Sequence, residues 1–266
     1  MIQDVKRAFK GSPFFPLYCR YIRPMRIRWQ MHQQLNQWAE SDERRMSFYR
    51  QFIKPGDLVF DIGANAGNRV KIFIRLGARV VAVEPQKICA DFLESAFKDN
   101  PNFILLRKAL GPEPGQGTIF VSKTHTISTM SAEWITAVRE SGRFAKEEWD
   151  TEEVVAMDTL DNLIAEFGEP SFIKIDVEGY EYAVLSGLSR PVKAVSLEFT
   201  PEHLESAYNC IDHMVHICDT EFQISLGESM TFYLSSWIGP SELKDALRKI
   251  PPRKFGDIYA RRTMNK

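Results

Sequence analysis

The chain has 266 residues, and its 34 basic and 35 acidic residues leave it almost neutral. This balance argues against broad nucleic-acid binding, which requires a dominant positive field. No apolar run approaches the roughly 18 residues of a membrane span, and the N-terminus lacks the apolar core of a signal peptide. The four cysteines show no CxxC spacing, so we expect reduced thiols in a cytoplasmic protein.

The first fifty residues differ in composition from the rest of the chain. Up to Arg28, seven basic residues accompany the single acid Asp4, and aromatic residues lie between them. Prolines divide this stretch, and we expect helices over residues 25–38 and 43–53. The pattern predicts an N-terminal helical extension over residues 1–53. It is either a cover packed on the main domain or an arm that contacts a membrane surface or a partner.

From residue 54 onward the pattern alternates between strand and helix. Apolar runs typical of buried strands occur at residues 58–60, 79–83, 103–106, 172–175 and 194–197. Helical patterns separate them, which predicts a doubly wound, mostly parallel α/β sheet. An antiparallel pair over residues 222–226 and 231–235 is expected to close it. We therefore predict one main domain over residues 54–266.

The apolar periodicity fades between residues 123 and 153. A long irregular insertion in a compact domain is usually either functional or mobile. We therefore predict that residues 123–153 form a lid over a site, and His125 and Ser128 lie within it.

A glycine-rich turn follows the first predicted strand, with the sequence Asp61-Ile-Gly63-Ala-Asn65-Ala-Gly67. Glycine and asparagine tolerate left-handed backbone conformations, and a strand–turn–helix order lets backbone approach a ligand closely. Glu84 ends the second strand about 20 residues after the first glycine, where an acid holds ribose hydroxyls. The combination predicts a site for a nucleoside-containing cofactor.

Acids stand at the carboxyl ends of four predicted strands: Asp61, Glu84, Asp176 and Glu198. Ligands of open α/β sheets bind at these ends, and converging acids favour a cationic or polyhydroxyl ligand over a pyrophosphate. The glycines also lack the G-x-G-x-x-G spacing of nicotinamide sites. S-adenosylmethionine matches better, because it carries a sulfonium, an ammonium and a ribose but no phosphate. A nicotinamide-dependent oxidoreductase is the alternative enzyme.

Several motifs together resemble the FkbM-type methyltransferase family. The most specific is Lys174-Ile-Asp-Val-Glu-Gly-Tyr-Glu181, and the resemblance extends over residues 56–200. It implies a class I methyltransferase, with a Rossmann-like sheet and an antiparallel C-terminal strand, that methylates a hydroxyl of a glycan, sugar or small metabolite. The cofactor-binding residues that it implies are Asp61, Gly63, Asn65, Gly67, Glu84, Pro85, Lys108, Ala109 and Asp176. A non-catalytic membrane- or partner-binding protein that retains this fold is the rival of a different class.

Methylation of a hydroxyl requires positioning and a base that accepts the proton. Asp176 is the first candidate, Glu178 the second and His125 the third, while Glu198 and Ser128 are expected to contact the acceptor. Structural roles compete with these: Asp176 as a helix cap or cofactor-orienting acid, Glu178 as a dipole partner in a first helical turn, and Glu198 as a cap. Lys174 is expected to pair with a buried carboxylate.

Two further features bear on metals and on nucleic acid. Asp176 and Glu178 suit Mg²⁺, but the sequence shows no third ligand. The His and Cys residues between Cys210 and Cys218 accompany the apolar stripe of a core-facing helix. We therefore predict no metal site. No Asn-Pro-Pro-aromatic motif follows the fourth strand, which favours a small-molecule or glycan acceptor over nucleic acid.

Overall fold

The computed structural model describes residues 23–263, so predictions for residues 1–22 lie outside the described residues. The chain divides into two compact units between Trp38 and Ala39. Helix α3 (Arg23–Asn36) belongs to the first unit, and α4 (Glu40–Tyr49) belongs to the second. The two helices match the expectation of a helical N-terminus. The division falls inside the predicted 1–53 extension, so α4 is part of the larger unit.

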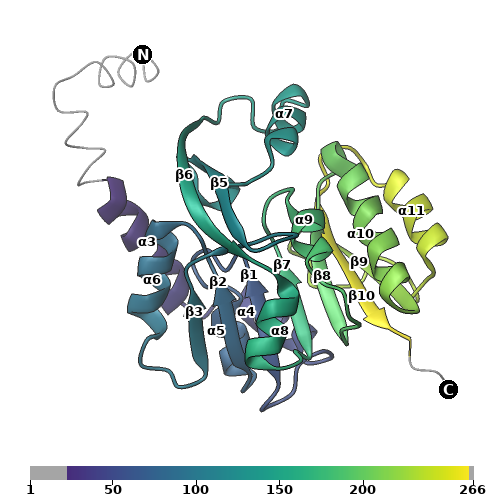
Figure 1. Cartoon of the computed structure of the whole chain (residues 1–266), viewed down its shortest axis with the longest axis horizontal. Helices are drawn as coiled ribbons and strands as arrows, with labels where there is room; N and C mark the ends of the chain where they lie inside the picture. The colour runs from purple at the N-terminus through teal and green to yellow at the C-terminus, as the bar shows by residue number, and fades with distance from the viewer. Residues whose placement is uncertain (1–22, 264–266) are drawn as a thin grey trace. The chain divides into compact units, whose positions relative to one another are not determined.

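A seven-stranded sheet forms the centre of the larger unit (Figure 1). Its order is β3-β2-β1-β7-β8-β10-β9, and only β10 runs antiparallel to its neighbours. The strands are β1 (Leu58–Ile62), β2 (Arg79–Val83), β3 (Phe103–Leu106), β7 (Phe172–Ile175), β8 (Ala194–Phe199), β9 (Thr220–Leu226) and β10 (Gly256–Arg262). The predicted mostly parallel sheet with an antiparallel C-terminal strand is confirmed.

One predicted strand is wrong. Residues 231–235 do not form a strand, and the antiparallel partner of β9 is β10. The sequence of β10 contains Asp257 and ends in two arginines, so it lacks the apolar run that marked the other strands. It is nevertheless buried from Gly256 to Ala260, because it lies between β8 and β9 in the sheet.

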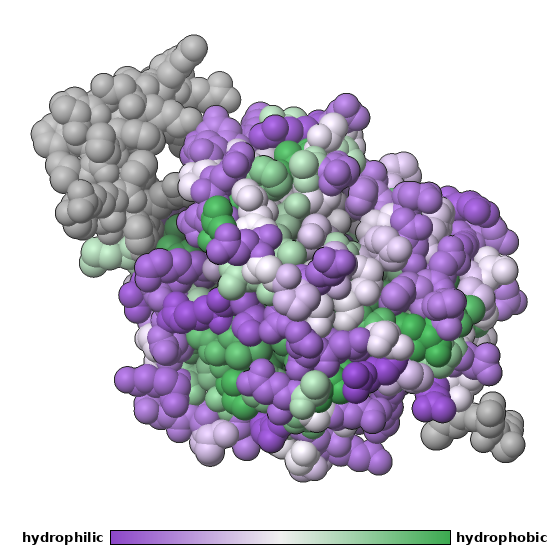
Figure 2. Space-filling view, in the orientation of Figure 1, coloured by the Kyte–Doolittle hydropathy of each residue, from purple (hydrophilic) through white to green (hydrophobic). Residues whose placement is uncertain are grey.

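Helices cover both faces of this sheet, as alternating strand residues require. Phe60 and Ile62 point to a core shared with α8 (Leu160–Phe167), α9 (Glu181–Ser186), α10 (Leu204–Ile217) and α11 (Pro240–Arg248). Val59 points to the opposite core, which includes side chains of α4, α5 (Val70–Arg75) and α6 (Lys87–Phe97). In Figure 2, hydrophilic side chains cover most of the visible face, and hydrophobic ones show in smaller patches between them.

Regular structure occurs both beside and within residues 123–153, the segment predicted to be irregular. A second sheet has the order β4-β6-β5, from β4 (Ala109–Leu110), β5 (Gly115–Ser122) and β6 (Trp149–Asp158). Between β5 and β6 lie η2 (His125–Ile127) and α7 (Ala132–Glu140). The fading periodicity was a poor guide within residues 123–153, because α7 buries Trp134 in a small separate cluster. A lid function for residues 123–153 stays a prediction.

Within residues 23–263, every helix is too short or too polar to cross a bilayer.

Candidate active site

A pocket of about 340 Å³ lies at the carboxyl ends of β1, β2, β7 and β8, within the size range of small-molecule sites. The structure brings most of the predicted site residues to it: Asp61, Gly63, Asn65, Glu84, Pro85, Lys108, Ala109, His125, Ser128, Asp176, Glu178 and Glu198. Gly67 does not line the pocket. A Cβ at Gly67 would lie 2.8 Å from the Phe97 ring, so this glycine permits close packing of the turn on α6.

The glycine turn places β1 directly against the end of β7. Gly63 has a φ of +80°, and a Cβ there would lie 2.0 Å from the carbonyl oxygen of Asp176. Only glycine allows this contact between the two backbones. Asn65 adopts a φ of +48°, and its Nδ2 donates a hydrogen bond to the His125 carbonyl at 3.1 Å. The turn therefore links the sheet edge to the inserted segment.

Glu84 is fixed by the backbone around it. It is 1% exposed, and its carboxylate accepts hydrogen bonds from the N–H groups of Asn65 (2.7 Å) and Gln86 (2.8 Å). Burial raises the pKa of Glu84 to about 7, although these two donors oppose the shift. The carboxylate thus faces the pocket in a fixed orientation and changes charge near neutral pH.

Asp61 offers an acceptor that the rest of the described chain leaves unused. The side chain is 2% exposed, and its buried Oδ2 has no hydrogen-bond partner among residues 23–263. Burial raises the pKa of Asp61 to about 6, while the positive charges of Lys174 and Arg69 oppose the increase. A buried carboxylate oxygen without a donor suits a cationic ligand group, because such a group would compensate its desolvation.

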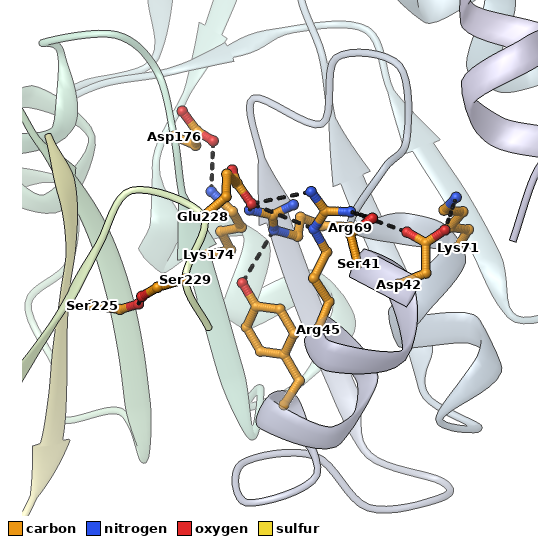
Figure 3. A network of polar contacts seen from close by, with 11 residues as sticks. Ser41, Asp42, Arg45, Arg69, Lys71, Lys174, Asp176, Ser225, Glu228 and Ser229 are labelled. Atoms are coloured by element: carbon orange, nitrogen blue, oxygen red, sulfur yellow. Dashed lines mark hydrogen bonds and ion pairs between the residues drawn. The ribbon is translucent and has the colours of Figure 1, made fainter. Parts of the chain in front are cut away.

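Lys174 forms the ion pair that the sequence predicted for a lysine inside a strand, but its partner Asp176 is partly exposed and not buried. Its Nζ lies 2.6 Å from the Asp176 Oδ2, and Figure 3 shows the two side chains pointing toward each other. The Lys174 side chain is 2% exposed and that of Asp176 is 34% exposed. Burial alone would lower the pKa of Lys174, but the negative charges of Asp176 and Asp257 raise it. The lysine is therefore a permanent cation beside Asp176.

A second ionic group connects the pocket to α4 (Figure 3). Arg69, which lines the pocket, contacts Glu228 at 2.7 Å and donates to the Tyr49 hydroxyl at 3.2 Å. Arg45 of α4 also contacts Glu228, at 3.2 Å, and pairs with the buried Asp42. Sequence reasoning missed Arg69 and Glu228, because neither stands at the end of a predicted parallel strand.

Three carboxylates meet on the wall formed by β7 and β8. Asp176, Glu178 and Glu198 each offer an oxygen, and these oxygens lie within 4.8 Å of one another. Burial raises the pKa of Glu178, and the charges of Asp176 and Glu181 add to the effect. The pKa of Glu198 is raised by burial and then by Glu178. The cluster therefore holds more negative charge than its surroundings favour.

The backbone at Glu178 is strained. Its φ is +55°, a region that non-glycine residues seldom adopt and that often marks a functional position. Helix α9 begins only at Glu181, so Glu178 lies before its first turn. The hydroxyl of Thr129, from the inserted segment, donates to the Glu178 carbonyl at 2.6 Å. The insertion thus helps to hold this residue in its unusual conformation.

The same three carboxylates are the group that could hold a metal ion. Carboxylate oxygens suit Mg²⁺, and Glu198 is the third oxygen donor that sequence reasoning did not recognise. The signal for it was available, since Glu198 ends a strand adjacent to β7. Lys174 already balances one of the three charges.

The inserted segment contributes the remaining predicted residues and one that was missed. Amides of Asn65 and Gln86 both donate to the His125 carbonyl at 3.1 Å, and burial lowers the pKa of its ring. The Ser128 hydroxyl accepts from the backbone N–H of Ser122, at 3.1 Å. Arg143 also lines the pocket. It lies in the aperiodic stretch, where no sequence signal marks it.

The profile of the methyltransferase FkbM domain matches residues 61–224. Similar solved structures include the Precorrin-6y C5,15-methyltransferase from Geobacter metallireducens GS-15, at 11% identity over 83% of this chain and 87% of that one, with a TM-score of 0.45. An O-methyltransferase from Bacillus cereus in complex with SAH has 11% identity over 90% of each chain and a TM-score of 0.42.

Aeropyrum pernix fibrillarin, solved with S-adenosyl-L-methionine, has 10% identity, covers 81% of this chain and 74% of its own, and has a TM-score of 0.40. A search of curated proteins found no matching relative. The family assignment therefore rests on the domain profile, which spans more than half of the chain, and on the seven-stranded sheet that carries the motifs. This protein belongs to the FkbM methyltransferase family and has the class I methyltransferase fold.

Proposed function

We propose that this protein is an S-adenosylmethionine-dependent O-methyltransferase whose acceptor is a hydroxyl of a glycan, a sugar or a small metabolite. One observation carries the proposal: the buried Glu84 and the cluster of Asp176, Glu178 and Glu198 border the same pocket. The first is suited to a ribose and the second to a hydroxyl that must lose a proton. Family membership supports methyl transfer as the reaction.

The pocket residues fit the cofactor. The unpartnered Asp61 oxygen can accept from the methionine ammonium, and the fixed Glu84 carboxylate can accept from ribose hydroxyls. Ala109, Leu110 and Ile119 supply apolar surface for an adenine. When bound, S-adenosylmethionine supplies a methyl group on a sulfonium. The chain's own residues then position the acceptor oxygen and remove its proton.

Among the carboxylates, we assign the proton acceptor to Glu178. Lys174 already contacts Asp176 at 2.6 Å, so one oxygen of that carboxylate is engaged in an ion pair. Glu178 forms no ion pair with any described residue, and burial raises its pKa, so it is a stronger proton acceptor than an ordinary solvent-exposed carboxylate. This order reverses the ranking from the sequence. Asp176 and Glu198 then accept hydrogen bonds that orient the acceptor.

Binding and transfer experiments test the proposal separately. Isothermal titration should show binding of S-adenosylmethionine and none of NAD⁺; the opposite result would establish the oxidoreductase alternative. A transfer assay with labelled S-adenosylmethionine across glycans and hydroxylated metabolites should yield a methyl ether, identified by mass spectrometry. A methyl group on nitrogen or carbon would refute O-methylation and leave the cofactor assignment standing. Cofactor binding without any transfer would favour the non-catalytic alternative.

A further inference from the structure

Helix α3 exposes an apolar pair on one side. Met25 is 71% exposed and Trp29 is 62% exposed. They are four residues apart, so they form one stripe along the helix. Ile27 and Met31 lie on the other side, since each residue advances the helix by roughly 100°, and Met31 is 1% exposed. The helix therefore presents large apolar side chains to water on the side away from its buried methionine.

Two cations accompany this stripe. Arg26 and Arg28 are both exposed, and the helical rotation places one on each side of the Met25–Trp29 stripe. No acidic residue occurs between Asp4 and Glu40. The surface thus combines apolar and aromatic groups with positive charge and has no carboxylate of its own segment to neutralise it.

The near-neutral total charge is the sum of a positively charged N-terminal segment and a negatively charged remainder of the chain. Seven Lys and Arg residues and one acid precede Glu40, which gives this segment a net charge of +6. From Glu40 onward, 27 basic and 34 acidic residues give a net charge of −7. Attraction to an anionic surface must therefore be local to the N-terminal segment, because such fields decay within about 10 Å at ordinary ionic strength.

We propose that α3 binds the surface of a membrane that contains anionic phospholipids. Met25 and Trp29 enter the headgroup region, and Arg26 and Arg28 contact lipid phosphates. An exposed Trp beside an apolar residue suits the membrane–water interface, and flanking arginines add attraction to anionic lipid. A nucleic acid would use the same charges, but it would leave the exposed Met25 without an apolar environment. The inference is independent of the methyl-transfer activity.

Sedimentation of the full-length protein with vesicles tests the proposal. We expect the protein to sediment with phosphatidylcholine vesicles that contain phosphatidylserine, to bind pure phosphatidylcholine much less, and to be released by added salt. Absence of binding to the anionic vesicles would overturn the proposal. Binding to an RNA oligonucleotide but not to these vesicles would overturn it as well and would identify the arm as a nucleic-acid contact.

Full-length variants locate the contact. Arg26→Gln with Arg28→Gln should weaken partitioning roughly 25-fold, since each cation near the surface contributes a factor of about 5. Met25→Ser with Trp29→Ser should weaken it at least roughly 10-fold. Circular dichroism should show that both variants remain folded. Vesicle binding equal to that of the wild type in both variants would refute the assignment to α3.

Matched controls come from the larger unit. Val154 is 71% exposed and Tyr233 is 55% exposed, so Val154→Ser with Tyr233→Ser removes a comparable exposed apolar pair. Lys54 and Lys98 are exposed, and Lys54→Gln with Lys98→Gln removes two charges. Both control variants should bind vesicles as the wild type does. Losses as large as those in the α3 variants would show that binding is not specific to this helix.

Discussion

The two walls of the pocket hold their carboxylates in different ways. On the wall formed by β1 and β2, Glu84 accepts two backbone hydrogen bonds that fix its orientation. On the wall formed by β7 and β8, Glu178 and Glu198 lie within 4.8 Å of each other with raised pKa values. Partly buried negative charge that is poorly compensated is costly, and an acceptor that donates hydrogen bonds to these carboxylates would reduce that cost. We therefore expect the wall formed by β1 and β2, the binding wall, to hold the cofactor, and the wall formed by β7 and β8, the reactive wall, to act on the acceptor.

The strongest test of this contrast is the exchange of a carboxylate for an amide on the reactive wall. Glu178→Gln should lower turnover by roughly 10²–10⁴-fold, because an amide cannot accept the proton. Binding of S-adenosylmethionine should change little, which titration can verify. Asp176→Asn is the matched comparison, and we expect a smaller loss from it. A large loss in Asp176→Asn together with full turnover in Glu178→Gln would return the role of base to Asp176.

Substitutions on the binding wall should have the opposite effect: they should weaken cofactor binding and change turnover at saturating cofactor little. Glu84→Ala should weaken S-adenosylmethionine binding by roughly 10–100-fold, because hydrogen bonds to a charged acceptor contribute about 1.5–3 kcal/mol. Glu94→Ala is the control, since Glu94 lies on α6 and pairs with Arg107 at the surface. Titration calorimetry measures both. If Glu84→Ala lowered turnover at saturating cofactor and left affinity unchanged, the division of labour between the walls would be wrong.

The two walls also differ in how well the sequence predicted them. The turn and Glu84 are local features, since fixed spacings along a strand–turn–helix unit determine where they lie. The reactive wall depends on contacts between distant segments: Glu198 meets Asp176 only because β8 pairs with β7. Arg143 and Thr129 come from an insertion whose structure depends on packing around Trp134. Motif spacing thus predicted the binding wall, whereas the neighbours on the other wall required the sheet register.

For the fold as well, the sequence predicted the local features and missed those that depend on pairing between distant segments. Parallel strands buried on both faces have continuous apolar runs, so β1, β2, β7 and β8 were recognisable. Strand β10 is buried as well, but it includes Asp257, Tyr259 and two terminal arginines, and its place between β8 and β9 depends on pairing across the sheet. The sequence pattern therefore led us to predict residues 231–235, and not β10, as the antiparallel partner of β9.

A test with a smaller expected effect lowers the pH, which removes the charge of Glu84 on the binding wall and should weaken cofactor binding. The pKa of Glu84 is about 7 in the free protein, well above its ordinary value, because the carboxyl is buried. We expect ribose hydroxyls to bind the ionised form, so cofactor affinity should be highest above pH 7 and should fall about tenfold in total between pH 8 and pH 6. Titrations between pH 6 and pH 8, about one unit on either side of that pKa, measure the slope. In Glu84→Gln the affinity should be lower and should fall only about twofold by pH 6, where Asp61, with a pKa of about 6, begins to take a proton. A pH dependence equal to the wild type's would assign the effect to a group other than Glu84.

The smallest expected effect concerns the reactive wall and a metal. Lys174 already places a positive charge 2.6 Å from Asp176, so a divalent cation among the three carboxylates would meet a fixed like charge. Treatment with EDTA should therefore change turnover by less than about twofold, since we propose that the carboxylates act on the acceptor directly and Mg²⁺ would otherwise be needed to organise them. Dialysed enzyme assayed with and without MgCl₂ completes the comparison. A loss on chelation that Mg²⁺ restores, and that Glu198→Gln abolishes, would instead identify this wall as a metal site and would make Glu178 a ligand.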